Sequence, residues 1–242
     1  MVGWTVPYTY VLLIVGVLFF SAFLYIEVHV AQSPLVPVKS LSKKCSFALA
    51  IVGCGWSSFG VWVYYTWQFL ENVRGNSPLS AAAQQSVVAA SGFVAAMSVG
   101  FLLHRVGVAV VMLMAMCAFL SGTLLIATTP VSQTYWAQTF VCFLIITFGM
   151  DLSFPSGTII LSQGMPREHQ GIAGSLIATV VNYSISLSLG IAGTILRQTD
   201  DGGQNVLGSY RNAWYFAIGL EGFGIGIALW FLGLSMRGRA AS

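Results

Sequence analysis

The sequence predicts an all-α polytopic membrane protein with seven transmembrane helices. Of its 242 residues, 57% are hydrophobic and only 7% are charged, whereas a soluble domain carries roughly 25% charged residues. The mean hydropathy is +0.82. A further observation is that seven apolar stretches each approach or exceed the roughly 20 residues that cross a bilayer. We expect these stretches to be helical, because a helix satisfies its own backbone hydrogen bonds in lipid.

Each predicted span is bounded by a short segment that carries charges or turn-forming residues. The breaks read "HVAQSPLVPVKSLSKK", "ENVRGNSP", "HRVG", "TTPVSQ", "QGMPREHQ" and "RQTDDGGQNVLGSYRN". The break "HRVG" is so short that its neighbouring spans must form a tight hairpin, and the run "PREHQ" predicts a second one. In chain order the spans are roughly 8–28, 46–70, 84–103, 107–128, 135–162, 171–196 and 213–236.

The positive charges predict the orientation of the chain. With the N-terminus outside, the inner connections hold Lys39, Lys43, Lys44, Arg105, Arg167, Arg237 and Arg239, and the outer ones hold Arg74, Arg197 and Arg211. Because lysine and arginine accumulate on the cytoplasmic side, this distribution favours an outer N-terminus and a cytoplasmic C-terminus. The net charge of +3 comes without a basic block, so nucleic-acid binding is not indicated.

Asp151 is the first candidate for a functional site, because an ionisable group at membrane depth usually faces a cavity or a partner. Helical spacing places it on one face with Pro155, Thr158 and Ser162. Proline removes a backbone hydrogen bond and kinks a helix, which suits a cavity wall or a proton site. The alternative is a structural aspartate near the inner face, paired with Arg105 or Arg167.

Asn182 belongs to a second polar face, formed in the sixth span by residues at intervals of three or four. That face comprises Ser175, Thr179, Asn182, Ser186, Gly190 and Gly193. Small residues permit close helix packing in lipid, and this accounts for the glycines and serines. The amide of Asn182 is explained equally by a polar path through the protein, so both interpretations stay open.

Two further clusters of polar and aromatic residues lie near the predicted outer ends of spans. Tyr64, Tyr65, Trp67 and Gln68 fit either an interfacial aromatic belt or an aromatic cage around a substrate, with Gln68 as its hydrogen-bonding group. Glu221 lies among glycines in the last span, where it requires water or a polar neighbour and is a candidate for a transport role.

Neither a metal site nor an enzyme is indicated. The three histidines fall in connections, and the four cysteines fall in or beside apolar stretches without a CxxC spacing. No nucleophile–base spacing is recognisable, so we expect no catalytic residues, no metal site and no cofactor.

Several motifs together resemble the major facilitator superfamily. The segment "GFLLHRVG" is similar to its cytoplasmic G-x-L-x-D-R-x-G loop: Gly100, Arg105 and Gly107 match, and His104 replaces the acidic residue. "SPLVPVKSL" resembles the segment leading into the C-terminal half of fourteen-span drug:proton antiporters. The run 151–176, followed by "QGIAGSLIATVVNYSISLSLGIAG", resembles the aminotriazole-resistance-type branch of fungal members.

The resemblance implies a fold and a domain organisation. The seven spans would be the eighth to fourteenth of that architecture, so that a linker helix (1–28) and a cytoplasmic connection (29–45) precede the C-terminal six-helix bundle (46–236) and a cytoplasmic tail (237–242). The second, fifth and sixth spans would line the central cavity. That makes Tyr65, Gln68, Asp151, Phe154 and Asn182 the expected substrate-binding residues, with Asp151 and Glu221 as candidates for proton coupling.

The resemblance also implies a function: proton-coupled efflux of small molecules, such as drugs or secondary metabolites, in the plasma membrane. Alternating access requires two bundles that rock around a shared site, so we expect a truncated chain that requires a complementary N-terminal half. Two alternatives remain, a seven-helix ligand-sensing receptor and an inert transporter remnant.

Overall fold

The computed structural model describes residues 7–30 and 42–240, and every regular element in them is helical. The predicted segment "SPLVPVKSL" (33–41) lies outside the described residues. In chain order the long helices are α1 (Pro7–Tyr25), α2 (Lys43–Gln68), α3 (Pro78–Gln85), α4 (Val87–Val106), α5 (Val108–Thr128), α6 (Gln138–Gly164), α7 (Ala173–Thr199) and α8 (Val206–Ala240). Short π-helical turns extend α1 (Ile26–Val30) and α2 (Phe69–Val73), and 3-10 turns precede α7 (Arg167–Ile172) and α8 (Asp201–Gly203).

The described residues contain seven helical segments that are long and apolar enough to cross a membrane, which confirms the predicted number. The third of them is formed by α3 and α4 together. The last one starts at Val206, earlier than the predicted residue 213. Arg211 and Asn212 lower the local hydropathy there, but helical backbone bonds do not depend on hydropathy, so α8 continues past the apolar stretch.

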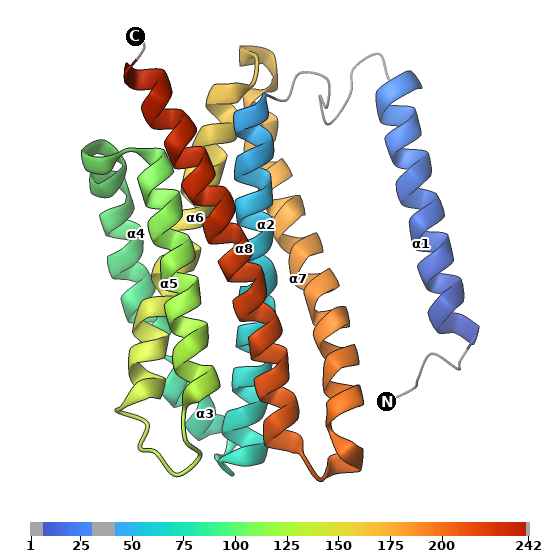
Figure 1. Ribbon diagram of the computed structural model, residues 1–242, viewed down its shortest axis with the longest axis vertical. Coiled ribbons are helices and arrows are strands. Elements are labelled where there is room, and N and C mark those ends of the chain that lie inside the picture. Colours follow the sequence, from blue (N-terminus) through green and yellow to red (C-terminus); the bar gives the residue numbers. More distant parts are fainter. Residues whose placement is uncertain (1–6, 31–41, 241–242) are drawn as a thin grey trace.

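The six spans after α1 pack side by side, and α1 stands apart from them (Figure 1). The large apolar side chains of α1 are exposed along its whole length, as expected for a helix surrounded by lipid. Helix α2 packs against α5, α6, α7 and α8 and supplies much of the core. Its Trp62 is buried and donates from Nε1 to Sγ of Cys142 on α6 at 3.2 Å.

Small residues bring α2 and α7 close together. A Cβ on Gly60 would lie 3.2 Å from Cα of Ile185, so no larger residue fits there without a shift. The hydroxyl of Ser188 donates to the carbonyl of Ser57 at 2.8 Å, and the hydroxyl of Ser57 donates to the carbonyl of Ser184 at 3.2 Å. Close approach with interhelical hydrogen bonds is the usual way that helices associate in lipid.

Arg74, just beyond the C-terminal end of α2, ties that end to the start of α6 and to the connection between α5 and α6. The guanidinium donates to Oγ1 of Thr139 and to the carbonyl of Pro130, each at 3.1 Å. It also lies 5.0 Å from the ring centroid of Phe69. Burial lowers the pKa of Arg74, and these contacts compensate for its partial desolvation.

Candidate functional site

Asp151 lies near the middle of α6 and is half-buried. Its nearest neighbour on α4 is Gly92, where a Cβ would lie 3.2 Å from Oδ2 of the aspartate. Both Arg105 and Arg167 have described side chains, and neither forms an ion pair with Asp151. The suggested pairing of Asp151 with one of these arginines is therefore not found among the described residues, and the alternative of a structural aspartate does not depend on that pairing.

Pro155 is one helical turn beyond Asp151 and lies inside a helix that continues to Gly164. Because proline has no N–H, it removes the donor that would bond to the backbone carbonyl of Asp151. The predicted face is confirmed: Asp151, Pro155, Thr158 and Ser162 are all half-buried. This face therefore offers both a carboxylate and a carbonyl without its helical N–H.

Trp56 of α2 contacts another side of α6, through Ser153 and Phe154, and was missed by sequence reasoning. Its Nε1 donates to the hydroxyl of Ser153 at 3.1 Å, and its ring stands edge-on to Phe154 at a centroid distance of 6.3 Å. Trp56 and Phe154 are both half-buried. Trp56 lies among small residues in the run "CGWSSFG", and this contrast in size is the sequence signal that marks it. Asp151, Ser153, Phe154 and Trp56 are termed the α6 patch below.

Tyr65 and Gln68 belong to a different place, at the C-terminal end of α2, which is the outer end in the predicted orientation. Tyr65 is buried and its ring centroid lies 5.7 Å from that of Tyr210 on α8. Gln68 accepts a hydrogen bond from Asn72, whose amide also donates to the hydroxyl of Tyr210 at 3.4 Å. Among the described residues, no hydrogen bond or ring contact joins this cluster directly to the α6 patch.

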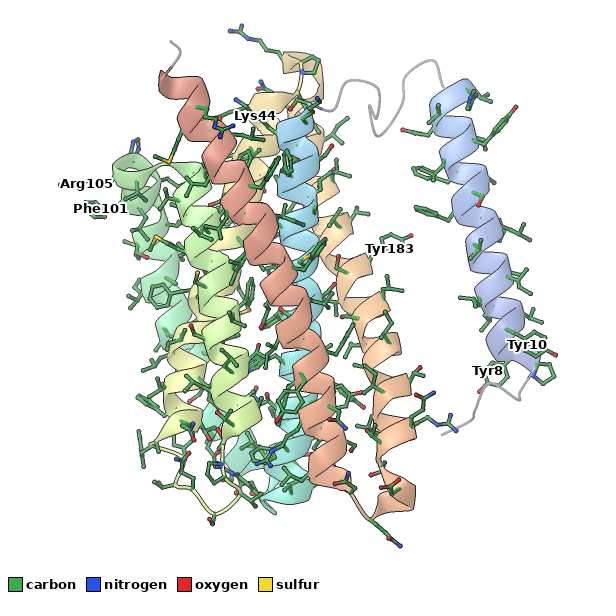
Figure 2. All side chains as sticks on the ribbon, viewed as in Figure 1. Tyr8, Tyr10, Lys44, Phe101, Arg105 and Tyr183 are labelled. Atoms are coloured by element: carbon green, nitrogen blue, oxygen red, sulfur yellow. The ribbon has the colours of Figure 1, made fainter. Side chains whose placement is uncertain are left out.

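Asn182 lies on the exposed face of α7. Its amide donates to the carbonyl of Ala178 at 2.9 Å, within its own helix. Thr179 and Ser186 likewise donate to carbonyls one turn earlier, and a Cβ on Gly190 would contact nothing within 4 Å. This polar face makes no close contact with the rest of the bundle, and the adjacent Tyr183 also projects outward (Figure 2).

Glu221 of α8 is completely buried between helices and not beside the α6 patch. Its Oε1 accepts a hydrogen bond of 2.7 Å from the hydroxyl of Thr123 on α5, whereas Oε2 has no hydrogen-bond partner. Of the two partners that the sequence left open, water or a polar neighbour, the structure shows a polar neighbour, Thr123.

The motif at residues 100–107 covers the end of α4 and the turn that follows it. A single residue connects α4 to α5, so the two helices form a hairpin. Gly107, at φ 82° and ψ 159°, separates the end of α4 from the start of α5. This backbone conformation is accessible essentially to glycine alone. Arg105 is exposed and lies 5.1 Å from the ring centroid of Phe101 (Figure 2). His104 and Gly100 are also exposed, and no hydrogen bond of the His104 side chain is found among the described residues.

The family model of the Major Facilitator Superfamily matches residues 1–191, well over half of the chain. The chain belongs to the major facilitator superfamily. The fold agrees with this family: a crystal structure of the nucleoside transporter NupG superposes with a TM-score of 0.66 at 14% identity, covering 79% of this chain and 48% of that one.

Curated relatives of this superfamily member include several fungal transporters. It is 56% identical to the low affinity ammonium transporter of Saccharomyces cerevisiae, over 94% of this chain and 44% of the relative. It is 43% identical to the efflux pump terJ of Aspergillus terreus, over 99% of this chain and 47% of that relative. It is 37% identical to the aminotriazole resistance protein of Saccharomyces cerevisiae, over 99% of this chain and 44% of that relative.

The chain therefore spans about half the length of the curated relatives that it matches. Its family and its seven candidate spans make it an integral, multi-pass membrane protein. The named relatives are transporters and not enzymes. Because the chain belongs to the major facilitator superfamily, the alternative of a seven-helix receptor is no longer needed.

Proposed function

We propose that this chain is the C-terminal half of a small-molecule exporter that is driven by protons across the plasma membrane. One observation carries the proposal: this member of the major facilitator superfamily contains the α6 patch. The carboxylate of Asp151 forms no ion pair within the described part of the chain. It lies three residues before the half-buried Phe154, in the middle of a candidate membrane span. Such intramembrane groups are costly unless they face water or a ligand.

The proposed domains are a linker helix (1–28), a connection (29–45), a bundle (46–236) and a tail (237–242). The proposed orientation is an outer N-terminus and a cytoplasmic C-terminus. In its support, Lys43, Arg105, Arg167 and Arg237 all belong to the same end of the bundle, to judge from the directions of the helices (Figure 1).

A complementary N-terminal half is proposed as a partner, because alternating access requires two bundles around one site. The exposed polar face of α7 supports this pairing. Serine, threonine and asparagine side chains there bond only within α7, so the face is better suited to a water-filled cavity between two halves than to acyl chains.

The proposed substrate-binding residues are Tyr65, Gln68, Asp151, Phe154 and Asn182, to which the structure adds Trp56. They fall into three places: the α6 patch, the exposed face of α7, and the outer cluster of α2. Asp151 and Glu221 are both proposed for proton coupling. The half-exposed position of Asp151 gives protons direct access, whereas any proton reaching Glu221 must pass through the packed core.

Ammonium or another small cation is a second candidate substrate. The relative that is 56% identical is named a low affinity ammonium transporter, and a carboxylate beside aromatic rings is chemistry that attracts cations. Asp151 supplies the carboxylate, and Phe154, three residues further along α6, supplies a ring that is packed against Trp56. The exporter and the cation carrier use the same patch and differ in the charge of the substrate.

The experiment is transport in proteoliposomes with an imposed pH gradient. The chain is tested alone and co-expressed with the N-terminal half of a relative, using methylammonium and aminotriazole as substrates. The proposal expects transport of one of them by the pair, and a loss of at least ten-fold in Trp56→Ala. Trp136→Ala, an exposed tryptophan outside the three places, is the matched control. If neither preparation moves or binds any substrate, the chain is an inert remnant.

A further inference from the structure

An apolar groove lies on the outer surface of the bundle between α2 and α8. It has a volume of about 460 Å³, and it is lined by Phe47, Gly222, Phe223, Gly226, Ile227 and Trp230. The two glycines form a low floor, since a Cβ on either would meet nothing within 4 Å. Phe223 and Trp230, each 66% exposed, stand on the same side of α8.

Three cations lie beyond the end of the groove that is nearest to the proposed cytoplasmic side. Lys43 and Lys44 precede Phe47 by about one helical turn on α2, and Arg237 follows Trp230 by two turns on the same face of α8. All three side chains are exposed. Figure 2 shows Lys44 at the end of the bundle where α8 finishes.

The charges of these side chains are not compensated within the described part of the chain. Lys43, Lys44 and Arg237 form no ion pair with any side chain that the structure describes. By contrast, Arg74 at the opposite end has two hydrogen-bond acceptors and an aromatic ring. An apolar groove that leads to three uncompensated cations is complementary to an amphipathic anion.

We propose that this groove is a binding site for an anionic phospholipid. One acyl chain would lie over Gly222 and Gly226, because a groove in a lipid-facing surface loses dispersion contacts unless a chain fills it. The phosphate and its anionic headgroup would meet Lys43, Lys44 and Arg237. In the proposed orientation this end faces the cytoplasmic leaflet, where anionic lipids are found and where basic pockets between helices bind them.

The test compares two lipids with identical acyl chains, dioleoyl phosphatidylserine and dioleoyl phosphatidylcholine, added to the purified full chain in detergent. Retention of each lipid is measured by native mass spectrometry. A cation near a negative lipid surface contributes about five-fold in affinity. The wild type is expected to retain phosphatidylserine preferentially, and Lys43→Gln/Lys44→Gln/Arg237→Gln is expected to lose that preference by roughly 100-fold.

Two variants control for the charge and for the groove. Arg167→Gln removes an exposed cation at the same end but outside the groove, so it should retain the preference. Gly226→Phe fills the groove and should reduce the retention of both lipids equally. Removing lysines near a helix N-terminus does not oppose the helix dipole, so the triple variant should fold. If the triple variant does not fold, the single variant Arg237→Gln tests the proposal, and it should lose about five-fold of the preference for phosphatidylserine.

Two results would overturn the proposal. The first is equal retention of the two lipids by the wild type, or an unchanged preference in the charge variant. The second is a chain dimer that Gly226→Phe dissociates, since the glycines would then pack against a second copy. The readout is lipid retention and not transport, so a failure here is distinguishable from a failure of the proposed function.

Discussion

Thr123 of α5 donates a 2.7 Å hydrogen bond to Oε1 of Glu221 on α8, and both side chains are completely buried. The other carboxyl oxygen, Oε2, has no partner. Ser58 of α2, which is also completely buried, is a second polar neighbour of this carboxyl. The stability of the buried acid therefore depends on neighbouring hydroxyl groups, of which Thr123 forms the 2.7 Å hydrogen bond.

Thr123→Val should lower the free energy of unfolding by roughly 1–2 kcal/mol, because it leaves the carboxyl of Glu221 without its hydroxyl partner at nearly constant volume. Thermal unfolding in detergent, followed by circular dichroism, measures the effect. Thr123→Ser keeps the hydroxyl and should lose less stability. Equal loss in the two variants would show that packing, and not the hydrogen bond, matters at this position.

Gly149→Ala should destabilise the packing of α6 against α5. A Cβ at this position would lie 2.6 Å from Cδ1 of Phe119, and overpacking of this kind costs about 1–3 kcal/mol. Gly219→Ala is the control, since its Cβ would contact nothing within 4 Å and alanine favours the helix. The thermal midpoint should fall in the first variant and stay or rise in the second.

Gly107→Ala should strain the hairpin between α4 and α5. The residue has φ 82° and ψ 159°, a conformation that costs an alanine about 1–3 kcal/mol. The expected result is a lower yield of folded protein and a lower thermal midpoint. Gly171→Ala, at a glycine without a positive φ and with open space around it, should leave both quantities unchanged.

Asp151→Asn should reduce transport driven by a pH gradient at least ten-fold in the chain paired with a complementary half. Asparagine keeps the size of the side chain but cannot carry a proton. Substrate exchange without a gradient should persist. The same two assays on Glu221→Gln assign the coupling role: loss of gradient-driven transport in this variant alone would transfer the role from Asp151 to Glu221.

The last prediction concerns which side chains of α6 and α7 are accessible to water in the membrane. Cysteines introduced at 151 and 182 should react with a water-soluble maleimide in intact membranes, because both positions are proposed to face water. A cysteine introduced at Phe93, which is 70% exposed on α4, serves as the comparison. Protection of 151 and 182 to the same degree as 93 would contradict a polar pathway along α6 and α7.

Local patterns were sufficient to predict the number of spans, the hairpin at Gly107 and the shared face of Asp151 and Pro155. Each depends on residues within one helix or one turn. The Trp56–Ser153 and Thr123–Glu221 hydrogen bonds join residues 97 and 98 positions apart. Helix packing brings such pairs together, and nothing in the spacing of one helix indicates them.

By itself the sequence determined that the chain is a bundle of membrane helices, with Asp151 and Glu221 each well inside a span, since a long apolar run has few other folds in lipid. The tertiary structure decided which environment each acid received. Neighbouring helices close completely around Glu221 and leave Asp151 half-exposed. Burial depends on which faces of separate helices meet, and this is a property of the packed bundle and not of any one segment.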